Sequence, residues 1–475
     1  MVKISKTTIV EFLSKITLTV AGFVSTLLFA RYLGSGVLGQ YFLLIGVLSW
    51  LEFAGQLGVT KAIQKRVSEN ELPAAYLGAG LLIQATIASL LAGAILLAGD
   101  YVNQYLGASV VEFVVLLVLV RLGYGYVTAG LRGQHRVATA ASLETAATVL
   151  QAGLQVLMAI GLGLGFLGLI YGYFSAFFII IVVGLLLISN RHRPALPSRE
   201  HVKKLLSFAQ YSWLGVLKTR TSAWMDIIVL GIFIPQSLVG IYGASWRVAV
   251  VISLASQSLW QTLFPAMSEL NANKNTPEIR SLFEKGLMYG GIIAIPGAVG
   301  LILLGSEILR IYGSEFTQGG HILAILAFSA LFASYEGQFR AALDATNRPD
   351  LTFISNLLFL VINVTGNIVL VWQFGWIGAA VATSGSMLVS LVYSYTLVDR
   401  TLGVTIPIGE IGKQVTASAV MAVVVVIVKE FTKTQPYYFV IMTITIGVLV
   451  YSLTLLVLSL EVRTKAMEFA DLLVN

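Results

Sequence analysis

Stretches of about twenty mostly apolar residues recur along almost the whole chain, and each is long enough to cross a bilayer as a helix. Short segments that carry Gly, Pro or charged residues separate them. The sequence predicts an all-α polytopic membrane protein of about fourteen transmembrane helices. The expected spans are 7–30, 37–58, 74–98, 109–130, 140–163, 166–189, 207–233, 239–264, 282–304, 320–343, 351–374, 376–398, 409–430 and 437–460.

Composition and absent motifs exclude most other classes of protein. Only 11% of the 475 residues are charged, against about 25% in soluble domains. The sequence contains no phosphate-binding loop, no His-Glu-x-x-His zinc motif and no Gly-x-Ser-x-Gly nucleophile turn. It has no cysteine, and its four histidines lie far apart. We therefore expect no enzymatic activity and no metal site.

The distribution of Lys and Arg predicts the topology, because cytoplasmic loops of membrane proteins are enriched in both. Basic residues concentrate in alternate loops, most strongly between residues 190 and 206. This bias predicts a cell-membrane protein with both termini cytoplasmic, and it explains the net charge of +7 without nucleic acid. The outer side holds only Arg31, Arg310, Lys429 and Lys433.

Three short motifs occur in each half of the chain, in the same order. Six predicted helices separate the copies, so the repeats share one membrane orientation, as parallel repeats do. We expect an N-lobe over 1–200, a C-lobe over 201–400, and two additional helices with a short cytoplasmic tail over 401–475. The matching segments are 37–41 with 238–242, 131–136 with 343–348, and 165–168 with 375–378.

Five basic residues fall well inside predicted spans, where each costs roughly 2.5–3.5 kcal/mol on insertion scales. Such residues are found where they face water or a counter-charge. The acidic residues of the spans lie mostly nearer the membrane surfaces, which leaves the middle layer net cationic. We expect this layer to bind the phosphate or pyrophosphate of a substrate. Its residues are Lys15, Arg121, Lys218, Arg220 and Arg247.

Some of these residues also have a structural interpretation. Arg121 either lines a cavity or forms an ion pair with a carboxylate such as Glu52. Glu11 lies four residues before Lys15 and is either its ion-pair partner or a carboxylate that couples transport to a cation. Asp226 is a second candidate for ion coupling.

Lys218 and Arg220 point about 200° apart around one helix, so both cannot face one cavity squarely. Lys218 shares its side with Asp226, whereas Arg220 lines up with Trp213 and Trp224. Both orientations remain open. Amide rows on other helices fit interhelical hydrogen bonds or contacts with sugar hydroxyls. They include Gln151, Gln155, Asn356, Asn363 and Asn367.

Four segments resemble one known family. The run 29–41, at the first predicted inter-helix turn, is similar to a recurrent pattern of the polysaccharide transporter (Wzx-type flippase) family. That family belongs to the multidrug/oligosaccharidyl-lipid/polysaccharide (MOP) exporter superfamily. Segments 58–62, 226–242 and 264–268 resemble it too. The resemblance implies two six-helix lobes that move lipid-linked oligosaccharides to the outer leaflet by alternating access, driven by an ion gradient.

We therefore expect a flippase for a polyprenyl-linked oligosaccharide that serves polysaccharide or glycan biosynthesis. A cation-coupled multidrug exporter of the same superfamily is the alternative, although it would need an acidic cavity. The expected partners are the substrate, membrane lipid and glycan-assembly enzymes. We expect a monomer with no cofactor beyond coupling Na⁺ or H⁺.

Overall fold

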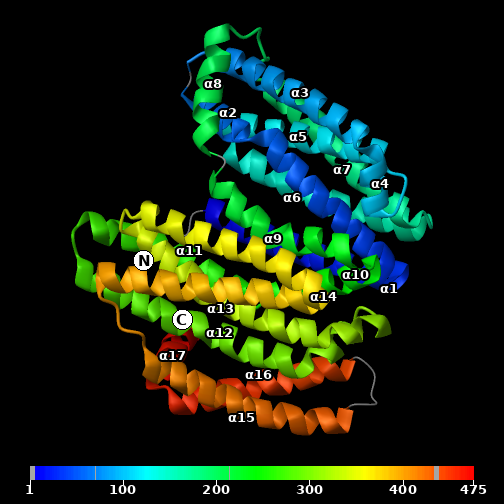
Figure 1. Cartoon of the computed structure of the whole chain (residues 1–475). Helices are drawn as coiled ribbons and strands as arrows, with labels where there is room; N and C mark the ends of the chain where they lie inside the picture. Colours follow the sequence, from blue (N-terminus) through cyan, green and yellow to red (C-terminus); the bar gives the residue numbers. More distant parts are fainter. Residues whose placement is uncertain (1–5, 70, 213, 433–437, 475) are drawn as a thin grey trace. The chain divides into compact units, whose positions relative to one another are not determined.

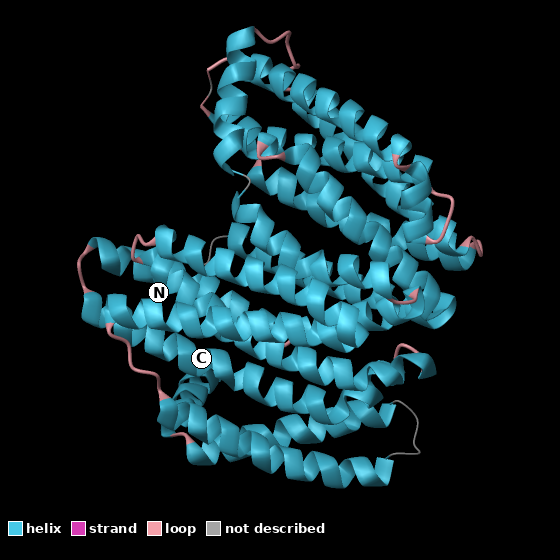
Figure 2. Cartoon of the chain, in the orientation of Figure 1, coloured by secondary structure: helices cyan, strands magenta, loops and turns pink. Residues whose placement is uncertain are grey.

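The computed structural model describes the backbone of residues 6–69, 71–212, 214–432 and 438–474. Side chains are described from residue 21 onward, except at 70, 210–216, 432–438, 466 and 469–475. Every regular element in this described part is a helix, as Figure 2 shows. The expected all-α fold is confirmed.

The chain divides into two compact units, Met1–Gly240 and Ile241–Asn475, and helix α10 (Gln236–Val250) runs across the division. The predicted lobe boundary at residue 200 stays a prediction. The first unit contains α1 (Lys6–Gln56), α2 (Val59–Ser68), α3 (Pro73–Leu97), α4 (Gly99–Leu106), α5 (Val111–Gly133), α6 (Val137–Val156), the π-helical turn η1 (Leu157–Gly161), α7 (Gly165–Ser189), α8 (Arg199–Ser212) and α9 (Leu214–Phe233) (Figure 1).

In the second unit, buried apolar residues form clusters between long helices. One cluster includes Phe283, Leu287 and Phe339, and a second includes Met421 and Tyr451. Its helices are α11 (Ser253–Ala272), α12 (Thr276–Arg310), the 3-10 turn η2 (Ser314–Gly319), α13 (Gly320–Ala345), α14 (Pro349–Leu402), α15 (Ile408–Thr432), α16 (Tyr438–Leu458) and α17 (Leu460–Val474).

Two of the helices are long enough to contain two predicted spans each. Helix α1 has 51 residues and is interrupted at Gly34, where φ is 80°. Helix α14 has 54 residues and is interrupted at Gly375, where φ is 58° and ψ is −135°. Glycine adopts these angles readily because it has no Cβ atom. Each break lies between two predicted spans.

By length and composition, 10 helices of the described part can cross a membrane, or up to 11 if the α10–α11 pair counts as one bent span. This number counts α14 once, although it contains two predicted spans. The structure is consistent with fourteen spans, and that number stays a prediction. Pro265 lies inside α11 and Pro296 inside α12, so neither proline ends its helix.

The structure adds short helices that apolar length alone does not reveal. Helix α8 begins inside the predicted 190–206 link, and α4 occupies a predicted outer loop. Helix α8 is amphipathic, with buried Leu205 and Ala209 on one side, and it packs against α2 and α3. Continuous apolar length predicts the spans alone, so it does not reveal amphipathic helices that lie between two spans.

The internal repeat is visible in local backbone geometry. His135 and Asn347 occupy equivalent places in two of the matching segments, and their φ angles are 61° and 58°. Each turn is closed by the same bond: the backbone N–H of Arg136 donates to Leu131, and that of Arg348 donates to Leu343, both at 2.9 Å. The repeat expected from the sequence therefore has a counterpart in the structure.

Candidate functional site

A carboxylate and two guanidinium groups meet inside the first unit. Arg121 of α5 donates to Glu52 of α1 from Nε at 3.2 Å and from Nη2 at 2.8 and 3.0 Å. Arg220 of α9 brings Nη2 to 3.5 Å from the Oε2 atom of Glu52. Its Nη1 donates to the Ser49 hydroxyl at 2.7 Å. We call Ser49, Glu52, Gln56, Arg121 and Arg220 the Glu52 cluster.

One face of α1 positions the acidic side of this cluster. Ser49, Glu52 and Gln56 are spaced three and four residues apart, so they lie on the same side of the helix. The Gln56 amide donates to Oε1 of Glu52 at 2.9 Å. The carboxylate thus accepts from Gln56 and Arg121 on one oxygen and from Arg121 on the other. The sequence named Glu52 as an alternative partner of Arg121, but it missed Ser49 and Gln56.

Aromatic rings fix the position of Arg121. Its guanidinium carbon lies 4.8 Å from the centroid of Phe177 in α7 and 5.3 Å from that of Tyr124 in α5. The two rings are in edge-to-face contact at 5.0 Å. Cation–π contacts and a two-point hydrogen bond therefore hold Arg121 from two sides.

The Glu52 cluster is largely removed from solvent and carries excess positive charge. The Glu52 side chain is 7% exposed, that of Arg121 20% and that of Arg220 24%. One carboxylate faces two guanidinium groups, so the three charges do not cancel. An uncompensated buried charge is costly, and a bound anion reduces that cost. The geometry therefore suits a phosphate more than a cation.

The structure brings only part of the predicted cationic layer together. Arg121 and Arg220 meet at Glu52, and Arg121 has the ion pair that was its alternative interpretation. Lys218 is half-buried and Asp226 is buried, both in α9. Arg247 belongs to the second unit, in the last turn of α10. That all the cations line one cavity stays a prediction.

Other predicted site residues lie outside the described part. Glu11 and Lys15 are in α1, within the stretch whose side chains are not described. The side chain of Trp213 also lies outside the described part. The expected Glu11–Lys15 pairing and the role of either residue stay predictions. No cluster of His, Cys, Asp or Glu suited to a metal ion occurs among the described residues.

The amide rows take part in hydrogen bonds between helices. Gln155 donates to Leu169 at 2.8 Å and to the Tyr41 hydroxyl at 3.2 Å, which links α6, α7 and α1. Asn363 donates to Thr383 at 3.1 Å, which ties the two halves of α14 together. These contacts fit the structural interpretation for Gln155 and Asn363, although the side-chain oxygens of Asn356 and Asn363 are buried and accept no hydrogen bond within the described part. Contacts with sugar hydroxyls stay a prediction.

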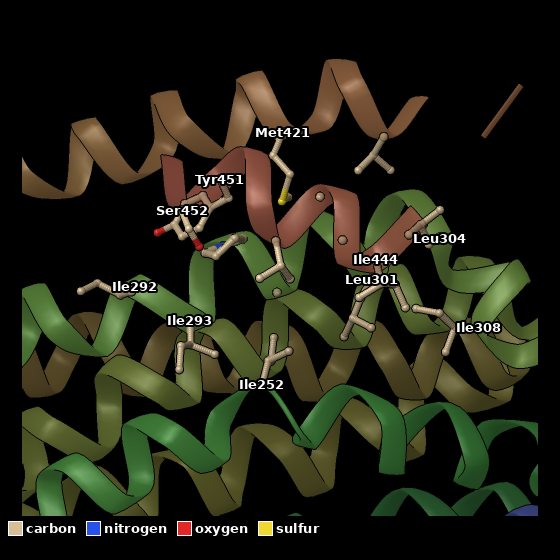
Figure 3. Close-up of a pocket in the computed structure, with 16 residues that line it drawn as sticks. Ile252, Ile292, Ile293, Leu301, Leu304, Ile308, Met421, Ile444, Tyr451 and Ser452 are labelled. Atoms are coloured by element: carbon tan, nitrogen blue, oxygen red, sulfur yellow. The ribbon is translucent and has the colours of Figure 1, made fainter. Parts of the chain in front are cut away.

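The second unit contains an apolar cavity of about 330 Å³ between α12, α15 and α16 (Figure 3). Its walls are formed mainly by Ile, Leu, Val and Gly, with Tyr451 and Ser452 among its few polar residues. A Cβ atom added at Gly300 would have no neighbouring atom within 4 Å. A hydrocarbon chain fits such a lining without loss of hydrogen bonds.

Paired helical repeats with charges held inside apolar spans define a polytopic membrane transporter. The family model described as lipid II flippase MurJ matches residues 82–449, most of the chain. The chain therefore belongs to the lipid II flippase MurJ family. The prediction of a flippase of the MOP superfamily is confirmed, and MurJ is the member whose family model matches.

Two relatives from the archaeon Haloferax volcanii match nearly the whole chain. The probable flippase AglR is 29% identical over 481 residues, with 98% of each chain covered. The probable low-salt glycan biosynthesis flippase Agl15 is 28% identical over 447 residues, with 94% of each covered.

Solved structures share the fold at low sequence identity. Lipid II flippase MurJ in an inward closed conformation has a TM-score of 0.79 at 17% identity, covering 94% of this chain and 98% of that one. An inward-facing multidrug resistance transporter of the MATE family has a TM-score of 0.66 at 15% identity, covering 82% and 98%. At these identities the likeness establishes the fold alone.

Proposed function

We propose that this protein is a flippase that moves an oligosaccharide linked to polyprenyl phosphate or pyrophosphate from the cytoplasmic to the outer leaflet. The product would serve polysaccharide or glycan biosynthesis. The excess positive charge of the Glu52 cluster is the observation that carries this proposal, because an anionic head group supplies the missing counter-charge. The flippase names of the two archaeal relatives support it.

The proposed substrate has an apolar part as well as an anionic one. The proposed head-group residues are the two arginines of the Glu52 cluster together with Lys218, Arg247 and Lys15. The cavity between α12, α15 and α16 suits part of the lipid chain, because its lining is almost wholly hydrocarbon.

The proposed transport cycle is alternating access. Residues 1–200 would rock against 201–400, and Na⁺ or H⁺ coupling through Glu11 or Asp226 would supply the driving force. The protein would act as a monomer without catalysis, with both termini in the cytoplasm, and would receive substrate from glycan-assembly enzymes. Export of cationic drugs is the less favoured alternative, because excess positive charge repels such substrates.

A deletion strain of the source organism tests the proposal. We expect lipid-linked oligosaccharide to accumulate on the cytoplasmic side and surface glycan to fall, both reversed by the wild-type gene. Mass spectrometry of extracted lipids would identify the accumulated sugar. Normal glycan and lipid pools, together with greater sensitivity to cationic drugs, would favour the exporter instead.

A further inference from the structure

Glu52 holds its two arginine partners unequally. Arg121 makes a two-point contact with distances of 2.8 to 3.2 Å. Arg220 lies 3.5 Å from the nearest carboxylate oxygen, beyond the usual hydrogen-bond range of 2.7–3.2 Å. Its short contact is instead with the uncharged Ser49 hydroxyl. An incoming anion would therefore displace the carboxylate from Arg220 more easily than from Arg121.

The surroundings of the two guanidinium groups differ in the same direction. Arg121 is packed against Phe177 and Tyr124, which restrict its movement. Among the described residues, no ring contact of this kind involves Arg220, and its side chain is slightly more exposed than that of Arg121. The planar guanidinium of Arg220 can bind phosphate oxygens in a two-point geometry. Arg121 is already engaged in that geometry by Glu52.

We propose, building on the flippase function above, that Glu52 is a displaceable counter-ion that selects for phosphorylated lipids. The phosphate of the substrate replaces Glu52 at Arg220, while Arg121 and Gln56 keep the carboxylate in place. Arg220 is thus the substrate-binding member of the Glu52 cluster. Of the two arginines proposed above for the head group, Arg121 is thereby assigned a positioning role that acts through Glu52.

This division of roles has a consequence for selectivity. A neutral lipid offers no charge to replace the carboxylate, so the contact between Arg220 and Glu52 persists when such a lipid approaches. A pyrophosphate linkage carries more negative charge than one carboxylate, and both phosphate and pyrophosphate offer more acceptor oxygens. The Ser49 hydroxyl accepts from Arg220 and can donate its own proton to a phosphate oxygen. The cluster therefore distinguishes charged from uncharged lipids before transport.

Lipid binding to the purified full-length protein tests the proposal, with farnesyl diphosphate as the charged probe and farnesol as the neutral one. Arg220→Ala should weaken binding of the diphosphate about tenfold or more, as expected for lost hydrogen bonds between charged groups. Glu52→Gln should tighten it roughly three- to tenfold, because the competing charge is gone. Farnesol binding should change in neither variant.

The chain provides a matched control pair. Arg132 and Glu144 also join α5 to another helix through an ion pair, at 2.6 Å, but their side chains are 38% and 32% exposed. Arg132→Ala and Glu144→Gln should leave diphosphate binding unchanged. Thermal unfolding verifies that each variant is folded. If Glu52→Gln does not fold, Glu52→Asp keeps the charge, withdraws it from Arg220 and should tighten binding by a smaller factor.

Three results would overturn the proposal: wild-type protein that binds both probes alike, an Arg220→Ala variant that binds diphosphate normally, or Glu52 variants that weaken binding as Arg220→Ala does. The deletion strain described under the proposed function distinguishes failure of the counter-ion proposal from failure of the flippase function. If lipid-linked glycan accumulates in the deletion strain but Arg220→Ala binds the diphosphate normally, only the proposed counter-ion role of Glu52 is refuted. The expected binding changes without glycan accumulation refute only the proposed transport role.

Discussion

Gly39 and Gly240 pack against each other in a reciprocal contact. A Cβ atom at Gly39 would collide with the backbone carbonyl of Gln236, and one at Gly240 would collide with that of Ser35. Gly39 and Gly240 are equivalent positions in the two copies of the repeat. Each copy therefore contributes the same glycine to the contact, together with the backbone carbonyl four residues before that glycine.

Gly39→Ala should destabilise the protein by about 1–3 kcal/mol, because close-packed interiors tolerate added methyl groups poorly. Gly36 lies one turn earlier in α1, and nothing lies within 4 Å of a Cβ atom there. Gly36→Ala should be neutral or slightly stabilising, since alanine favours helix more than glycine does. Thermal unfolding in one detergent compares the two variants. Equal unfolding temperatures would mean that the glycine contact is not tight.

Arg121→Ala should destabilise the protein by about 3–5 kcal/mol, because it leaves the Glu52 carboxylate buried beside an incomplete set of partners. Arg132→Ala removes a more exposed ion pair from the same helix, and it should cost about 1 kcal/mol or less. Unfolding of the purified variants and their expression levels provide the comparison. Similar losses for both would show that the Glu52 pair is not energetically distinct.

The predicted topology can be tested directly, because the chain contains no cysteine. Ser198 precedes α8 in the predicted cytoplasmic link, and Ser314 begins η2 in a predicted outer loop; both are exposed. In intact cells, a membrane-impermeant maleimide should label Ser314→Cys and leave Ser198→Cys unlabelled until the cells are broken. The reverse pattern would place both termini outside.

Gly300→Leu should partly fill the apolar cavity of the second unit, since a Cβ atom there meets nothing within 4 Å. If the cavity binds the lipid chain, affinity for a long polyprenyl phosphate should fall about tenfold, the equivalent of one or two lost buried methylene groups. Affinity for a short-chain analogue should change less. Gly93→Leu on α3, also in open space, is the control. Equal effects on both chain lengths would argue against a role in chain binding.

The sequence was informative about spans and repeats because both depend on local patterns. Apolar length located the helices, and the two glycines that interrupt α1 and α14 fall between predicted spans. Gly168 and Gly378, matched by sequence alone, both pack directly on neighbouring backbone. Helices α4 and α8 were missed because their amphipathic character does not resemble a continuous apolar run.

The candidate site was less predictable, because side-chain partners come from distant parts of the chain. The sequence could not decide which way Arg220 points, and the structure directs it to Ser49 and Glu52 on α1. It named Glu52 as one partner of Arg121, but a single carboxylate shared by two arginines requires three helices to meet. Only the packing of α1, α5 and α9 specifies that arrangement.

The turns that end α5 and α13 share one backbone path although their side chains differ. His135 stands in one and Asn347 in the other, and both residue types are enriched at positive φ. This pattern is what a gene duplication leaves when the conformation is retained and the residues diverge. The two hexapeptides, 131–136 and 343–348, would then be interchangeable modules, and a chimaera that exchanges them should still fold.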